Sequence, residues 1–171
     1  MYEVDNKDEV IELKDFPQSS IGAPIPTILA SEHKVSIAYY LQNMPSDWDG
    51  TTVKVMDESS IEPVAIVVFE RCYAKYFGPP NDEAFEGHPL ANRGLTPYAC
   101  FEVRNSSWIR KLERMNSVHP YHDKQRFLSI WRHFILAFHD SIFECIATDY
   151  SIRTEIGSIE DIIPKMAKHI Q

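Results

Sequence analysis

Residues 131–150, WRHFILAFHDSIFECIATDY, decide the fold of this chain. Two apolar runs are separated by a short polar segment, which is the pattern of two strands joined by a turn in a β-hairpin. If Asp140 and Ser141 form a two-residue turn, side chains alternate cleanly between two faces. We expect one face to lie on the core because its members are apolar or cysteine: Phe134, Leu136, Phe138, Phe143, Cys145 and Ala147. Cys145 is then a small buried hydrophobe and not a nucleophile.

The other face of this hairpin carries the residues that could perform chemistry. In the two-residue register His139 and Glu144 are diagonal neighbours, with Cα atoms roughly 7–8 Å apart. They are the candidate catalytic pair, as an acid/base dyad or as half of a metal site. His133 would lie about 13 Å along the strand and would not join them. The alternative is that both histidines are ordinary half-exposed sheet residues, and a three-residue loop would change the register.

The remaining strands predict an α+β fold that is mainly β. Short turns, not helices, join successive strands, so the sheet is expected to be antiparallel. We expect a curled sheet or a small β-sandwich or barrel. The run at 63–69, PVAIVVF, is apolar without alternation, which is typical of a central strand. We also expect a short edge strand near Val10, a turn at 44–50, and strands at 51–56 and 98–104.

Two helices are expected. SWIRKLERMN, residues 107–116, carries one apolar stripe, with Ser106 or Ser107 as N-cap, and the stripe is Trp108, Ile109, Leu112 and Met115. A short C-terminal helix follows Ser158, which forms a capping box with Asp161. Pro164 is expected to break any helix that runs through it, unless the helix begins there.

The length of 171 residues favours a single domain spanning 1–171. Residues 1–32 are expected to be an extended covering segment, because three prolines between 17 and 26 oppose a helix. Residues 77–97, FGPPNDEAFEGHPLANRGLTP, form a long irregular loop of the kind that often carries function.

The net charge of −8 argues against a nucleic-acid partner or an anionic membrane surface, and it suits a soluble protein. The chain has three widely spaced cysteines, which indicates reduced thiols and a cytoplasmic location. No apolar run approaches the roughly 20 residues of a membrane span.

Two further groups of residues are candidate sites. The loop residues Asp82, Glu83, Glu86, His88 and Arg93 are candidates for ligand or partner binding, although Asn, Asp, Gly and Pro are turn formers first. His119 and His122 lie three residues apart and, with His139 and Glu144, are candidate ligands for a zinc-like divalent metal. No cofactor is predicted otherwise, and loop histidines satisfied by backbone and water are the alternative.

The phrases FGPPNDEAFEGHPL, FEVRNSSWIRKLERMN and HFILAFHDSIFECIA resemble those of a group of small, uncharacterised bacterial proteins. The resemblance covers roughly residues 60–150. It implies a bacterial cytosolic protein, and it carries no activity and no catalytic residue to this chain.

The expected function is a non-enzymatic binding or protein-interaction module, whose partner is a protein or a small molecule. Its expected working surface is the 77–97 loop with the polar hairpin face. The acidic balance and the absence of GxGxxG, GxxxxGK[ST], HExxH and GxSxG motifs favour this view. The alternative is a metal-binding enzyme of cupin-like β-fold that uses His139 and Glu144.

Overall fold

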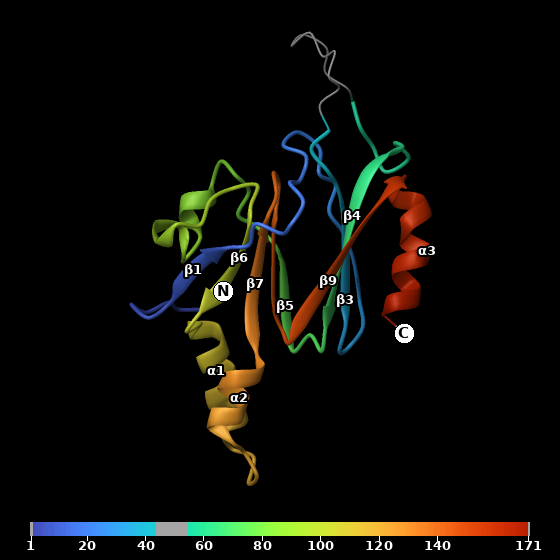
Figure 1. The fold of residues 1–171 in the computed structure, drawn as a ribbon. Helices are drawn as coiled ribbons and strands as arrows, with labels where there is room; N and C mark the ends of the chain where they lie inside the picture. The colour runs from blue at the N-terminus through green and yellow to red at the C-terminus, as the bar shows by residue number, and fades with distance from the viewer. Residues whose placement is uncertain (1, 44–54, 171) are drawn as a thin grey trace.

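Two antiparallel sheets pack face to face, with helices on their outer sides (Figure 1). The computed structural model describes residues 2–43 and 55–170. The turn expected at 44–50 and most of the strand expected at 51–56 lie outside the described residues. Val55, which is described, is exposed and belongs to no strand.

The first sheet has five strands in the order β1-β6-β7-β8-β5. In chain order these are β1 (Glu9–Glu12), β5 (Ala74–Gly78), β6 (Cys100–Arg104), β7 (Arg132–Ala137) and β8 (Ile142–Ala147). The second sheet has the order β2-β3-β4-β9. Its strands are β2 (Thr27–Ala30), β3 (Val35–Tyr40), β4 (Glu62–Glu70) and β9 (Asp149–Gly157). The expected α+β, mainly β fold is confirmed as two open sheets, and β1 is an edge strand as predicted.

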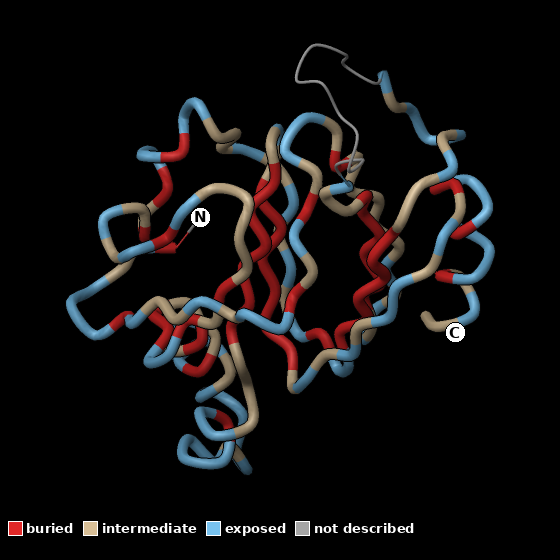
Figure 2. The backbone as a smooth tube through the Cα atoms, turned by 45° about the horizontal axis from the view of Figure 1, so that its top comes forward, coloured by how far each residue is buried: buried red, intermediate tan, exposed pale blue. Residues whose placement is uncertain are grey.

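The main core fills the space between the sheets. The hairpin β7–β8 contributes the face predicted from its alternation, and β3 and β4 face it with residues such as Ile37, Val67 and Phe69. Figure 2 shows this burial as continuous red through the central strands. The non-alternating run in β4 is central, as expected, because β4 pairs with β3 on one side and β9 on the other. Both of its faces are apolar because one faces the core and α3 covers the other.

Helix α1 (Ser107–Asn116) has the predicted bounds, and the Ser106 hydroxyl caps it by accepting the Ile109 N–H at 3.3 Å. Its stripe is buried at Ile109, but Met115 is 65% exposed. A second helix, α2 (Lys124–Ile130), was not expected. Asp123 caps α2 by accepting the Arg126 N–H at 3.0 Å, a short-range signal that the Pro120 connector obscured.

Helix α3 (Ile159–His169) begins after the predicted cap Ser158. The break expected at Pro164 is wrong, because the helix continues through this residue. An interior proline costs about 3 kcal/mol. Burial of Ile159, Ile162 and Met166 against the second sheet offsets this cost.

Two covering segments complete the outer face of the first sheet. The 77–97 loop contains two short 3-10 helices (Phe85–Gly87 and Ala91–Arg93) and buries Phe85 and Leu90 against the sheet. The N-terminal segment also lies on this face, where Tyr2 joins the same cluster. Within the part of the chain that the structure describes, no helix is long and apolar enough to cross a membrane.

Candidate functional site

The turn of the β7–β8 hairpin lies one residue earlier than expected. Phe138 N–H donates to the Ser141 carbonyl at 2.9 Å, so His139 and Asp140 occupy the turn. Glu144 consequently pairs with Ile135 and not with Ala137. The register therefore differs by two residues from the predicted one.

A shift of two residues leaves each side chain on its expected face, because side chains alternate with period two. It changes which residues are neighbours across the strands. The diagonal neighbour of Glu144 becomes His133, and His139 moves out of reach. The expected pairing of His139 with Glu144 is therefore wrong, and so is the exclusion of His133.

Glu144 lies at the centre of a buried polar cluster. Its Oε1 accepts from His88 Nε2 at 2.9 Å, and its Oε2 accepts from His133 Nε2 at 2.9 Å and from the Tyr2 hydroxyl at 2.8 Å. The side chains of Glu144, His88 and His133 are at most 1% exposed. Ser106 Oγ lies 2.9 Å from His133 Nδ1 and completes the cluster.

The backbone and the neighbouring donors fix the protons of this cluster. His88 Nδ1 accepts the Leu90 N–H at 3.1 Å, so the ring proton of neutral His88 lies on Nε2, facing Glu144. The Glu144 carboxylate can only accept, so His133 carries a proton on Nε2, and in the neutral ring Nδ1 is the acceptor for the Ser106 hydroxyl proton. Neutral His133 thus also donates to Glu144 through Nε2.

Glu144 is an ionised carboxylate inside the protein. Burial alone raises its pKa, but hydrogen bonds from His133 and His88 outweigh burial and hold the pKa at about 2. The pKa of Tyr2 is raised, whereas that of Glu144 is lowered. Burial is the larger cause, and the negative charge of Glu144 adds to it.

Five segments that are distant in sequence supply the cluster. Glu144 comes from β8, His133 from β7, His88 from the 77–97 loop, Ser106 from the β6–α1 junction, and Tyr2 from the N-terminal segment. Tyr2 is held over the carboxylate by stacking on Trp108, with ring centroids 5.3 Å apart. The N-terminal segment is fixed in turn by Asp8, whose carboxylate accepts the Ser107 N–H at 2.6 Å.

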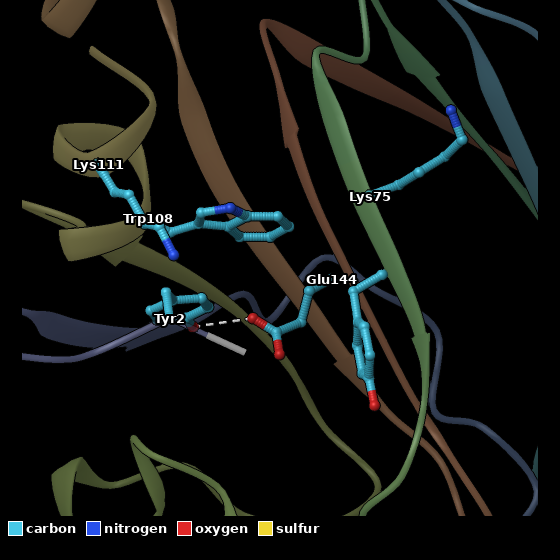
Figure 3. Close-up of a pocket in the computed structure, with 6 residues that line it drawn as sticks. Tyr2, Lys75, Trp108, Lys111 and Glu144 are labelled. Atoms are coloured by element: carbon cyan, nitrogen blue, oxygen red, sulfur yellow. Dashed lines mark hydrogen bonds between the residues drawn. The ribbon is translucent and has the colours of Figure 1, made fainter. Parts of the chain in front are cut away.

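A pocket of about 240 Å³ opens beside this cluster, lined by Tyr2, Lys75, Tyr76, Trp108, Lys111 and Glu144. Figure 3 shows Tyr2 bonded to Glu144 with Trp108 and Lys111 beside them. Lys75 extends away from the carboxylate (Figure 3). Its ammonium donates to the Ser31 carbonyl at 3.3 Å. Lys111 is therefore the lysine whose charge the pocket can use.

His139 belongs to a second, more exposed cluster at the hairpin turn. Its Nδ1 lies 3.0 Å from Asp82 Oδ2 and 3.0 Å from the Tyr98 hydroxyl, which also donates to Asp82. The hydrogen bond from Tyr98 lowers the pKa of Asp82, whereas burial and the same bond raise the pKa of Tyr98 to about 12. Asp82 N–H donates to the His139 carbonyl at 2.9 Å, so this cluster holds the turn and thereby sets the register.

The remaining predicted site residues are dispersed. His122 Nε2 lies 3.0 Å from Glu113 Oε1 between α1 and α2, and His119 is exposed beside Tyr121. The expected metal ligands His119, His122, His139 and Glu144 thus have separate surroundings. Among the described residues, no group of three or more His, Cys, Asp or Glu side chains could hold a metal ion.

The loop candidates also divide between different roles. His88 is in the Glu144 cluster and Asp82 in the His139 cluster, whereas Glu83 and Glu86 are exposed. Arg93 donates to the Asp8 carbonyl oxygen at 3.3 Å. Cys145 lies in the core, and its burial raises the pKa of its thiol.

Sequence reasoning did not select Tyr2 or Ser106 as site residues. Ser106 carried a signal as the cap of α1, but its hydroxyl proton points to a histidine 27 residues away. Tyr2 lies in an acidic, irregular segment without periodicity. A comparison of the chain with protein-family models, curated proteins and solved structures finds no match, so the resemblance to small bacterial proteins stays a prediction.

Proposed function

We propose that this protein is a binding module for a small molecule that occupies the pocket beside Glu144. The observation that carries the proposal is a carboxylate kept ionised, at 1% exposure, where a pocket reaches it. Taking a charge out of water costs several kcal/mol, so a buried charge beside a pocket is a candidate for function. The cytoplasmic location and the bacterial origin belong to the same proposal, supported by three free thiols and by the resemblance.

Glu144 retains capacity for one more donor. An ionised carboxylate offers about four acceptor sites, and His88, His133 and Tyr2 use three of them. A ligand N–H or O–H group that reaches the fourth site makes a charge-assisted hydrogen bond in a low dielectric. The low pKa makes Glu144 a weak base, so its role here is recognition and not proton abstraction.

The walls of the pocket define the rest of the ligand. Tyr76 and Trp108 present aromatic surface, and the pocket is smaller than the roughly 300–1,000 Å³ typical of drug-sized sites. Lys111 has no ion-pair partner among the described residues and can receive an anionic group. These features together fit a small aromatic molecule that carries both an amine and a carboxylate.

Binding of three related probes, measured by calorimetry at pH 7, tests this proposal. Phenylalanine carries both groups, phenethylamine lacks the carboxylate, and 3-phenylpropionate lacks the amine. We expect phenylalanine to bind most tightly, with a loss of at least about tenfold on removing either group, since one charge-assisted hydrogen bond is worth about 1.5–3 kcal/mol.

Two variants identify the site. In Lys111→Ala the advantage of phenylalanine over phenethylamine should disappear, whereas Lys124→Ala, an exposed lysine on α2, should behave as wild type. Equal binding of all three probes by wild type, or no binding of any, would contradict the proposal. The sequence favours a binding function on the surface of the 77–97 loop and the polar hairpin face, and this proposal places the binding site in one pocket.

A further inference from the structure

We propose that Ser106 is a nucleophile, activated by His133 as general base and Glu144 as the residue that positions His133. This goes beyond ligand binding, because it assigns an acyl-transfer activity to Ser106, which contacts the ring nitrogen of His133 that does not face Glu144. The atoms form an unbroken chain: Ser106 Oγ is 2.9 Å from His133 Nδ1, and His133 Nε2 is 2.9 Å from Glu144 Oε2. A serine, a histidine and a carboxylate in such a chain are recognised by geometry and not by their sequence order.

The direction of each hydrogen bond suits proton transfer. Ser106 donates its hydroxyl proton to the lone pair of His133 Nδ1 in the neutral ring, because the ring proton of that form lies on Nε2 and faces the Glu144 carboxylate. The Nε2–H of His133 points to an ionised carboxylate, which stabilises the imidazolium that forms when Nδ1 takes the proton. Ser106 also stands at the N-terminus of α1, where the helix dipole favours negative charge on its oxygen.

Ser106 borders a pocket of about 400 Å³ that is separate from the one beside Glu144. Ile109, Leu128 and Trp131 supply its apolar wall, and Arg104 contributes a guanidinium that pairs with no other described residue. His133 therefore connects the pocket of the proposed nucleophile with the buried carboxylate. The lining fits a carboxylic ester that carries a negative charge.

The reaction balances with water as the second reactant. The Ser106 Oγ–carbon bond forms as its proton passes to His133 Nδ1, and the bond to the leaving alcohol breaks as that alcohol takes the proton. Water then attacks the acyl-serine with the same histidine as base, which releases a carboxylic acid and restores Ser106.

A fluorophosphonate probe tests the nucleophile directly, with the labelled residue mapped by mass spectrometry of the intact chain. Attack forms an Oγ–phosphorus bond, expels fluoride and transfers the proton to His133. We expect label at Ser106 and none at Ser158, which caps α3 in the same manner and is equally buried but has no histidine partner among the described residues. No label at Ser106, or equal label at both serines, would overturn the proposal.

Two variants separate chemistry from folding. Ser106→Gly keeps an acceptable cap, at a cost of a few tenths of a kcal/mol, and should lose the label. His133→Gln retains a donor for Glu144 but removes the nitrogen beside Ser106, and labelling should slow at least about 100-fold. Unchanged labelling in folded His133→Gln, judged by circular dichroism, would remove the general base from the scheme.

The positioning role of Glu144 has its own readout. In Glu144→Gln the midpoint of the pH profile of labelling should move to lower pH, because the imidazolium of His133 loses its anionic partner. A purely structural role predicts a loss that is equal at every pH. Mono-4-nitrophenyl succinate should be hydrolysed faster than 4-nitrophenyl acetate, and the preference should vanish in Arg104→Ala; equal rates in wild type would refute the anionic substrate.

Discussion

Replacement of Glu144 by glutamine tests the energetic account of the buried cluster. The pKa of this carboxyl is about 2 in the folded protein against an ordinary value of 4.5. A difference of one pKa unit between the folded and unfolded states corresponds to about 1.4 kcal/mol. The ionised side chain therefore contributes about 3 kcal/mol to the free energy of unfolding at pH 7. In Glu144→Gln this contribution is absent. The side-chain amide nitrogen of the glutamine also takes the place of a carboxylate oxygen, and it cannot accept the hydrogen bonds from the histidines or Tyr2.

The sign of the pH dependence follows from the lowered pKa. The contribution is complete well above pH 4.5, falls as the unfolded carboxyl takes up protons, and vanishes below about pH 2. At pH 3 about 2 of the 3 kcal/mol should already be lost. The stability gap between wild type and Glu144→Gln should therefore narrow from at least about 3 kcal/mol at pH 7 to about 1 kcal/mol at pH 3.

Urea denaturation at the two pH values measures this gap. Glu86→Gln is the matched control, since its exposed carboxylate lies on the loop that carries His88 and should change stability by less than about 0.5 kcal/mol. A gap of the same size at pH 7 and pH 3 would show that Glu144 contributes through shape and not through its charge.

Three further substitutions extend the test to other parts of the molecule. Tyr2→Phe removes one donor to Glu144 and should lower the free energy of unfolding by about 2 kcal/mol in urea titration; an unchanged value would mean that Tyr2 does not hold this charge. Phe69→Ala, in the core between the sheets, should cost about 3–5 kcal/mol in the same assay, and a loss below 1 kcal/mol would argue against the packing of the two sheets. Arg132→Met breaks the half-exposed pair with Glu102 and should change thermal stability by no more than about 1 kcal/mol, with a smaller effect in 1 M NaCl; a large, salt-independent loss would contradict this.

In the β7–β8 hairpin, the local sequence pattern predicted which face is buried but not which residues pair across the strands. Alternation assigned Phe134, Phe143 and Cys145 to the core correctly, because a register shift of two residues leaves every face unchanged. The same shift decided the chemistry, since it replaced His139 by His133 beside Glu144. No local signal chose between the two registers: His139 occupies the turn because Asp82, from a distant loop, bonds to both its backbone and its ring.

For the helices, the sequence predicted where α1 and α3 begin but not that α3 continues through Pro164. The cap of α1 was placed at Ser106 or Ser107 and that of α3 at Ser158 from their own neighbourhoods, because a cap depends on the three residues that follow it. That α3 continues through Pro164 depended on burial of its apolar face against a sheet formed by strands far away in the chain.

The sequence by itself determined the fold class, the core face of the hairpin, the bounds of α1 and the central place of β4. These follow from periodicities of two and 3.6 residues and from capping, which act over a few residues. Only the tertiary structure decided that Tyr2, His88, Ser106, His133 and Glu144 meet at one point. Their contacts span up to 142 positions in the chain, and hydrogen-bond geometry at that range depends on how whole segments pack.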